Sequence, residues 1–412
     1  MLLYKQTLFL SAVLLAGILQ NSSFASDQTK NKTSRGQETE APSGFDGLTN
    51  GLVDQATFNE DMHTFEERDT KDEGLGPVYN AESCVECHQN PVTGSASQHT
   101  VVRAGIFNGK DFLDPPGGSL IPDRAIDAAI QACVSDQSNV RSLRMSLNTL
   151  GDGFVEAIAD ETLLKIAALQ PNQSEGAIHG EAILVDLLEA PGYQRIGRFG
   201  WKDQHASLLS FSGDAYRNEM GVTNPLVPTE HTSNGHSVQK FDTVADPEDN
   251  GEELEIFTEF MRASKVPPRD TRLAASETAK YGERLFEKTG CGICHVATVS
   301  TAPAGTLING GTYTVSPALG NKIIHPYSDF LLHDVGTGDG IVQNGGQGTR
   351  NKLRTSPLWG LRTRTRLLHD GSALTIRDAI ISHRGEAARI TKRFNDLPKG
   401  DKEKMLRFLN SL

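Results

Sequence analysis

The amino-acid sequence predicts a mainly α protein made of two related modules, with long loops and a small irregular or β middle region. Short helical stretches alternate with Gly and Pro turns, and the 412 residues include 40 glycines, which indicates long loops around something that orders them. A short unit, Cys-x-x-Cys-His, occurs twice, at residues 84–88 and 291–295. The two halves resemble each other only around these units, so the pattern predicts two related modules and no tandem repeat.

The first residues have the three parts of a secretory signal. Lys5 precedes an apolar run over residues 8–19, and small residues follow at Ser23 and Ala25. We therefore expect a signal peptide over residues 1–25, cleaved after Ala25, and a periplasmic protein. An uncleaved anchor is the alternative, but the run is shorter than the about 20 residues that a spanning helix needs. No later stretch is apolar enough to span a bilayer, so we expect no integral membrane span after cleavage.

Residues 26–44 are polar and short of apolar side chains, which predicts a disordered linker. A helical pattern ends before Pro267, and a new one leads into the second Cys unit, so a domain boundary is expected there. The expected domains are an N-terminal domain over 45–265, with a long insertion, and a C-terminal domain over 266–412, each with one Cys unit. Strand-like pieces such as EAILVDLL and GRFGW belong to the β middle region.

The charge balance argues against nucleic acid as a partner. The chain has 52 Asp and Glu against 40 Lys and Arg, a formal net charge of −12. A net negative surface repels phosphate and is better suited to a basic protein or a neutral small molecule.

A Cys-x-x-Cys-His unit has three readings: covalent haem attachment, half of a zinc site, or a dithiol redox pair. Two units could supply four thiolates to zinc. Three features favour haem instead: His directly follows each pair, the chain is expected to be exported, and a helical pattern leads into the second unit. We therefore expect two covalently attached c-type haems. Residues 45–265 are then expected to form an N-terminal haem c domain with a long insertion, and residues 266–412 a C-terminal cytochrome c-like haem domain. The thioether cysteines are Cys84, Cys87, Cys291 and Cys294, and the proximal ligands are His88 and His295. The fifth cysteine, Cys133, is expected to be a small buried hydrophobe.

Residues 375–383 have the pattern of a helix that ends in a histidine. Thr375 and Asp378 form a start like a capping box. Ile376, Ala379, Ile380 and His383 share one helical face. His383 is therefore either a core histidine bonded to the backbone or the distal ligand of the second haem.

Other histidines remain as candidate ligands or as hydrogen-bonded core residues. His99 follows the first unit closely enough to loop over the first haem. His205, His325 and His333 have no assigned partner, and His333 with Asp334 is a candidate pair that tunes a site without touching iron.

Five arginines lie among apolar residues between the second unit and this helix. Guanidinium groups are suited to the haem propionates, while a solvated basic face is the alternative. Arg354 and Arg362 are the candidates that we retain for cofactor binding. The five are Arg350, Arg354, Arg362, Arg364 and Arg366.

The two Cys units, with HPYSDFLLHDVGTGDGIVQNGG and RTSPLWGLRTRTRLLHDG, resemble the bacterial family called di-haem oxidoreductase, putative peroxidase, also labelled thiol oxidoreductase. The resemblance runs from about residue 45 to the C-terminus and is strongest from Gly282. The family is similar in turn to bacterial di-haem cytochrome c peroxidases and to related enzymes that oxidise a partner protein to build a quinone cofactor.

The resemblance also implies residue roles. The peroxidase segment HDG…TL falls on His369, Asp370, Gly371 and Thr375, and His383 stands where the peroxidases have a distal Met. A stretch with a Trp between the haems and a distal acid falls on Trp201 and Glu219, which are thereby the candidate electron conduit and catalytic acid. A surface acid is the alternative for Glu219. The distal Gln of the peroxidases would fall near Phe211.

Related peroxidases hold calcium between the haem domains, on a segment that corresponds to RTRTRLL, residues 362–368. This segment lacks the expected proline, so calcium is a further candidate cofactor only.

The resulting functional prediction is an exported di-haem c-type oxidoreductase. It would reduce hydrogen peroxide, or another small substrate, with electrons from a small donor protein, a cytochrome or a cupredoxin. Two alternatives remain: a non-catalytic di-haem electron carrier with both irons six-coordinate, and an oxidase of a protein or thiol substrate.

Overall fold

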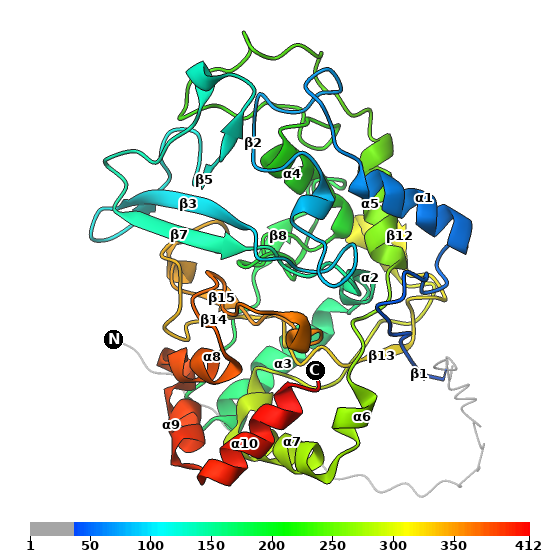
Figure 1. Ribbon diagram of the computed structural model, residues 1–412, viewed down its shortest axis with the longest axis vertical. Coiled ribbons are helices and arrows are strands. Elements are labelled where there is room, and N and C mark those ends of the chain that lie inside the picture. The colour runs from blue at the N-terminus through cyan, green and yellow to red at the C-terminus, as the bar shows by residue number, and fades with distance from the viewer. Residues whose placement is uncertain (1–36) are drawn as a thin grey trace, which may run out of the picture. The chain divides into compact units, whose positions relative to one another are not determined.

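Ten α-helices provide most of the regular structure in residues 37–412, which are the residues that the computed structural model describes (Figure 1). Their bounds are α1 Gln55–Glu66, α2 Asp152–Glu156, α3 Asp160–Gln173, α4 Leu208–Ala215, α5 Glu252–Ala263, α6 Thr271–Ala274, α7 Glu277–Thr289, α8 Ile376–Ser382, α9 Ala388–Asp396 and α10 Lys399–Leu409. In this part of the chain, no helix combines the length and the apolar character that crossing a membrane requires. The predicted signal peptide, 1–25, lies outside the described residues, as does the predicted linker as far as residue 36.

Fifteen strands accompany the helices in residues 37–412, and only β3 and β7 exceed three residues. The strands are β1 Thr39–Glu40, β2 Val78–Tyr79, β3 Thr100–Phe107, β4 Phe112–Leu113, β5 Leu120–Ile121, β6 Arg124–Ala125, β7 Val140–Met145, β8 Leu184–Asp186, β9 Gln194–Ile196, β10 Val299–Ser300, β11 Leu307–Ile308, β12 Tyr313–Thr314, β13 Lys322–Ile324, β14 Leu332–His333 and β15 Leu353–Arg354. The largest sheet is antiparallel: β3 pairs with β7, β4 and β5, and its register runs from Thr100 opposite Met145 to Gly105 opposite Val140.

The mainly α prediction is therefore corrected to a mixed α/β architecture. Strands are not confined to the expected middle region, because β10 to β15 lie beyond residue 265. Strands of two or three residues leave no periodic apolar pattern in the sequence, which is why they were not predicted. Of the two strand-like pieces, EAILVDLL contains β8, whereas GRFGW makes only an isolated bridge from Phe199 to His205.

The end of the predicted linker is ordered. β1 pairs in parallel with β13, and Ser43 forms a bridge with Val266. Asn50 Nδ2 donates to the carbonyl oxygens of Arg262 at 2.7 Å and Ser264 at 3.1 Å. The disorder expected for residues 39–44 is thus wrong, because their backbone groups find partners in distant segments. The predicted domain division at 265/266 stays a prediction.

A large apolar core lies between α1 and α5 and extends to the first Cys unit. Phe58 and Phe65 of α1 pack on Phe260 of α5, with ring centroids 5.3 Å and 4.8 Å apart. All three rings are buried, and burying each one stabilises the fold by about 1.5–3 kcal/mol. Cys84 packs against the edge of this core.

A second core lies between α7 and α10, which run side by side in Figure 1. Phe286 and Phe408 meet with ring centroids 5.3 Å apart. Gly282 lets the helices approach closely, because a Cβ there would lie 2.0 Å from the carbonyl oxygen of Lys404. Cys291 packs against this core, so each Cys unit rests on its own apolar cluster.

Candidate functional site

Two large cavities each contain one of the Cys-x-x-Cys-His units. The first cavity, of about 1240 Å³, is lined by both cysteines and the histidine of the unit at 84–88. The second cavity, of about 1300 Å³, is lined by the same three residues of the unit at 291–295. Trp201 and Arg354 line both cavities. The two units therefore lie at separate cavities that share two wall residues.

The two units have the same backbone turn. Each begins with a short 3₁₀ turn, at Cys84–Glu86 and Cys291–Ile293. The N–H of the histidine that follows donates to the carbonyl of the first cysteine, at 3.1 Å in the first unit and 3.0 Å in the second. The second unit directly follows α7, as predicted, and Gly290 ends that helix with a φ of 101° that favours glycine. The first unit follows β2 and a loop instead.

The donor groups at both cavities fit a c-type haem. All five cysteines are among the described residues, and none forms a disulfide. Burial raises the pKa of Cys87 to about 12 and that of Cys291 to about 11, so both are protonated thiols. Burial lowers the pKa of His88 and of His295 to about 4, so both imidazoles are neutral at pH 7, the form that binds iron. His295 Nδ1 donates to the carbonyl of Tyr327 at 3.0 Å, which leaves Nε2 free to bind a metal.

An unpaired guanidinium also fits the haem. Arg364 lines the second cavity, and its buried Nη2 atom has no hydrogen-bond partner among residues 37–412. Burial lowers the pKa of Arg364 to about 10, so the group stays charged and is suited to a propionate. Arg354, predicted for this role, lines both cavities. Arg362, also predicted, lines neither: it donates to the carbonyl oxygens of Pro268 and Leu412 and so holds the C-terminus.

Glu219 lies in the wall of the first cavity, on a π-helical turn that continues α4. Such turns are frequent at functional sites. Asn80 Nδ2 donates to Glu219 Oε2 at 2.8 Å, and the Glu219 carbonyl accepts the N–H groups of Asn80 and Ala81. Burial raises the pKa of Glu219, although Arg103 and Asn80 oppose the shift. The structure thus brings the predicted acid to the first Cys unit, in a state that favours holding a proton.

Two further residues affect what the first cavity can bind. His99, predicted as a ligand, lines this cavity together with His88. Phe211 also lines it and stacks on Phe199 at 5.9 Å, so an apolar ring stands where the resemblance expects a Gln. The ligand role of His99 stays a prediction.

His383 lies in the wall of the second cavity. The predicted helix forms as α8, and the Thr375 side chain accepts from the N–H of Asp378 at 3.0 Å. The four residues of its predicted apolar face, Ile376, Ala379, Ile380 and His383, all line the cavity. His383 Nδ1 donates to the carbonyl of Ala379 at 2.7 Å, which leaves Nε2 as a possible ligand atom. Burial lowers the pKa of His383, so it is neutral at pH 7. The predicted helical face is confirmed, and the ligand role stays a prediction.

Trp201 is buried and lies in the wall shared by the two cavities. Its Nε1 donates to the carbonyl of Met145 at 2.8 Å, which fixes the ring. The ring centroid of His369, which lines the second cavity, is 6.2 Å away. The position between the cavities agrees with the predicted conduit role, which no measurement tests.

The remaining predicted histidines line neither cavity, apart from His333. His205 Nε2 lies 3.0 Å from Asp214 Oδ2, and His325 Nε2 lies 3.0 Å from Glu40 Oε2. Cys133 is exposed, and its N–H donates to Asn234 Oδ1 at 2.9 Å. The expectation of a buried Cys133 is therefore wrong, because the residue lies at the surface.

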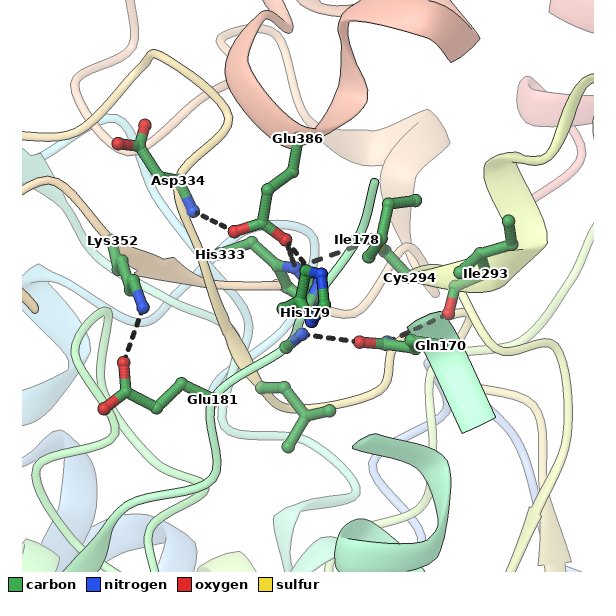
Figure 2. A network of polar contacts seen from close by, with 12 residues as sticks. Gln170, Ile178, His179, Glu181, Ile293, Cys294, His333, Asp334, Lys352 and Glu386 are labelled. Atoms are coloured by element: carbon green, nitrogen blue, oxygen red, sulfur yellow. Dashed lines mark hydrogen bonds and ion pairs between the residues drawn. The ribbon is translucent and has the colours of Figure 1, made fainter. Parts of the chain in front are cut away.

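His333 contacts two acids that the sequence did not indicate, of which Figure 2 labels Glu386. Its ring bonds to Asp329 and to Glu386, at 2.9 Å each. Asp334, the predicted partner, contributes only backbone groups: its N–H donates to Glu386 Oε1 at 3.1 Å, and its carbonyl accepts the N–H of Glu386 at 3.0 Å. Because 53 residues separate His333 from Glu386, no local pattern could have identified this pair.

A group of acids elsewhere has the donor atoms that metal ions prefer. It contains one carboxylate oxygen from each of four residues, all within 4.8 Å of one another. It includes none of residues 362–368, the segment considered for calcium, so the calcium prediction stays untested. The four are Glu230, Asp242, Asp246 and Glu248.

Comparisons with known proteins place these motifs in a family. No curated protein matches the chain. Among solved structures, a hydrazine synthase of Kuenenia stuttgartiensis is 14% identical, with a TM-score of 0.39 over 96% of this chain and 100% of that chain. A MauG-like protein associated with microbial copper homeostasis is 14% identical, with a TM-score of 0.41 over 93% and 94%. Neither similarity is strong enough to support an argument about function.

The family model for di-haem oxidoreductases matches residues 123–412, which include the second Cys unit and the residues between the cavities. This match covers more than half of the chain and confirms the family predicted from its motifs. The chain therefore belongs to the family described as "Di-haem oxidoreductase, putative peroxidase", a family of di-haem redox enzymes.

Proposed function

We propose that the protein is an exported, periplasmic enzyme that reduces hydrogen peroxide with electrons from a small redox protein. One observation carries the proposal: two cavities with equivalent Cys units share Trp201, but the first offers a buried acid, Glu219, and the second offers another imidazole, His383. The first cavity offers a carboxyl group that would move a proton, and the second offers two imidazoles, His295 and His383, that would hold an iron. Each cavity would be the centre of one cytochrome c-like haem domain.

In this proposal the chain holds two covalent haems. The cysteines of each unit form the thioethers, and His88 and His295 are the proximal ligands. Arg354 and Arg364 pair with propionates, since the Arg364 guanidinium has a buried nitrogen without a partner among the described residues. When bound, haem supplies a redox-active iron in each cavity.

Glu219 would move the proton that peroxide cleavage requires. Breaking the O–O bond of hydrogen peroxide needs one proton transferred from one oxygen to the other, and a nearby carboxyl group can accept and return it. Asn80 donates to Glu219 Oε2, and burial raises the Glu219 pKa, which favours the protonated carboxyl group. Phe211 and Phe199, whose rings stack with centroids 5.9 Å apart, form an apolar part of the wall of this cavity.

The electrons would enter from a donor protein and pass through the shared wall. Trp201 is held rigidly by Met145 and lines both cavities, so it offers an aromatic path between them. The formal charge of −12 favours a donor with a basic docking face, such as a small cytochrome or cupredoxin.

A second candidate function rests on His99, which lines the first cavity. If His99 is an axial ligand there, both irons are six-coordinate and the protein is an electron carrier. The variant His99→Ala separates the two functions, because a carrier would gain a high-spin signal on losing the ligand, whereas the proposed enzyme would show one before the substitution.

The proposed function is tested by rapid mixing of the fully haem-loaded, half-reduced protein with hydrogen peroxide. We expect a fast change in the haem absorbance and steady peroxide consumption that requires a reduced donor protein. No spectral change would favour the carrier. Consumption without a donor, accompanied by modification of another protein or thiol, would favour an oxidase.

A further inference from the structure

Asp329, His333 and Glu386 form a buried cluster of charges, called here the charge cluster. Figure 2 labels two of its members, His333 and Glu386. His333 Nε2 donates to Asp329 Oδ2, and His333 Nδ1 donates to Glu386 Oε2, both at 2.9 Å. Because each ring nitrogen faces a carboxylate, the imidazole is held as the cation. The side chains of Asp329, His333 and Glu386 are 0%, 2% and 16% exposed. The cluster thus contains two negative charges and one positive charge, and its net charge is negative.

The charge cluster adjoins the second cavity. His333 lines that cavity, and its Nδ1 atom lies 3.9 Å from Cys294 Sγ. Figure 2 shows Cys294 beside the His333 ring. Cys294 is one of the two cysteines expected to bond the second haem, so the cluster lies where the edge of that macrocycle would be. The first cavity has no counterpart, since no carboxylate–histidine–carboxylate group lines it in residues 37–412.

Neighbouring groups hold the cluster in a fixed geometry. Gln170 Nε2 donates to Asp329 Oδ2 at 2.6 Å and to the carbonyl of Ile293 at 3.1 Å, which links the cluster to the second Cys unit. Glu386 also accepts the N–H groups of His179 at 2.9 Å and Asp334 at 3.1 Å. Taking three charges out of water costs several kcal/mol for each ion, and apolar residues of similar volume would often be as stable. Stability alone therefore does not explain the cluster.

We propose that the charge cluster stabilises the oxidised state of the second haem and so lowers its reduction potential. This inference rests on the proposed function, because it requires a haem in the second cavity. Reduction adds one electron and removes one positive charge from the iron. A fixed negative charge nearby opposes that change, and it acts strongly in a buried, weakly polarisable environment. Burial and charge around a haem are established means of setting its potential.

The lowered potential has a direct consequence for electron flow. A second haem that gives up its electron readily drives transfer toward the first cavity, where Glu219 would serve the substrate. The charge cluster therefore influences the reaction through the reduction potential of the second haem and does not contact the substrate.

The test is the variant Glu386→Gln. Gln has the same shape, retains an oxygen that accepts from His333, and removes one negative charge. Asp329 still holds the proton on His333, because it is fully buried and 2.9 Å away. We expect a spectroelectrochemical titration of the fully loaded variant to show a positive shift in the potential of the second haem. The first haem should keep its potential, and Glu386→Asp should keep the potential of the second haem near that of the unaltered protein.

The matched control is Glu181→Gln. Glu181 pairs with Lys352 at 2.7 Å, its side chain is 36% exposed, and it lines neither cavity. The substitution removes the same charge in the same region (Figure 2) and should shift the potential much less. Equal shifts in the two variants, or no shift in Glu386→Gln, would overturn the inference.

A separate observation distinguishes failure of the inference from failure of the proposed function. If the unaltered protein has no haem on the 291–295 unit by peptide mass, the proposed function fails.

If Glu386→Gln loses its fold, Asp329→Asn replaces it, since it also removes one negative charge. A positive shift of the second potential is then expected, and its absence in folded, loaded Asp329→Asn contradicts the inference.

Discussion

The two cavities start from the same local chemistry and differ in what faces it. In both, a 3₁₀ turn presents two cysteines and a histidine above an apolar core. The first cavity then meets Glu219 on a π-helical turn, and the second meets His383 at the end of α8. The attachment motif alone therefore cannot tell a reactive haem from a storage haem. The segments that close each cavity, more than 100 residues away for Glu219, make that difference.

The charged groups near each unit support the same contrast. The second unit adjoins the charge cluster and the buried guanidinium of Arg364, whereas the first has an acid whose pKa is raised by burial. Fixed charges near a haem change its reduction potential, and a carboxyl group with a raised pKa can transfer protons. The predictions below test this division of roles, from the largest expected effect to the smallest.

Removal of one cysteine pair should remove one haem. For Cys84→Ser with Cys87→Ser, we expect intact mass under denaturing conditions to fall by one haem, and Cys291→Ser with Cys294→Ser should do the same. The reason is that, in the proposed function, each cavity attaches its own haem through its own thiols. A protein that loses both haems, or neither, from one double substitution would show that the cavities are not independent attachment sites.

Glu219→Gln should lower peroxide turnover by roughly 10²-fold or more, because the first cavity would lose the carboxyl group that we propose as its proton carrier. Steady-state kinetics with a reduced donor protein measure the effect. Glu252→Gln is the control, since Glu252 is an exposed acid at the start of α5. Equal activity of the two variants would remove Glu219 from the mechanism and leave the first cavity without an assigned reaction.

His383→Ala should leave both haems attached but convert the second from low-spin to high-spin. The substitution removes an imidazole from the cavity wall and leaves Cys291 and Cys294 intact. Absorbance and magnetic spectra of the ferric protein report the spin state. His236→Ala, at an exposed turn, should change nothing. An unchanged spectrum in His383→Ala would mean that His383 is a core histidine, the alternative that the sequence left open.

Asp214→Asn should have the smallest effect, which is a decrease in the free energy of unfolding. Burial raises the pKa of Asp214, but the hydrogen bond and charge of His205 outweigh it and hold the pKa at about 2. A depressed carboxyl pKa stabilises the fold above the unfolded value of about 3.9, and this contribution is lost as pH falls toward 2. We expect the variant to lose on the order of 1–2 kcal/mol of unfolding free energy at pH 6, and less at pH 3.

Denaturant titrations at several pH values measure that difference. Asp136→Asn provides the comparison, since Asp136 is exposed. A loss for Asp214→Asn that stays constant from pH 6 to pH 3 would show that the His205 pair does not couple stability to pH.

The sequence predicted those parts of the site that depend on local pattern. The Cys units, the capped helix from Thr375 and the face that carries His383 follow from residues close together in the chain. It did not distinguish Arg362 from Arg364, which lie two residues apart in the sequence. Only the folded structure shows that Arg362 binds the carbonyl of Leu412, whereas Arg364 has a buried nitrogen at the cavity that is unpaired among the described residues. It also missed Glu386 as the partner of His333, which depends on the meeting of distant segments.

The fold was predicted less completely, for similar reasons. The helices around the second unit have clear start and stop signals, such as Ser276 and Gly290 at the two ends of α7. The short strands and the pairing of β1 with β13 have no such signals, since two-residue strands are defined by their partners. Tertiary pairing therefore changed a mainly α prediction into a mixed α/β structure.

The low-temperature electron paramagnetic resonance spectrum of the fully loaded ferric protein most directly tests whether the two cavities have different roles. We predict one high-spin and one low-spin haem in equal amounts, with the low-spin signal lost in His383→Ala. Two low-spin signals in the unaltered protein would contradict the division of roles and identify the protein as an electron carrier.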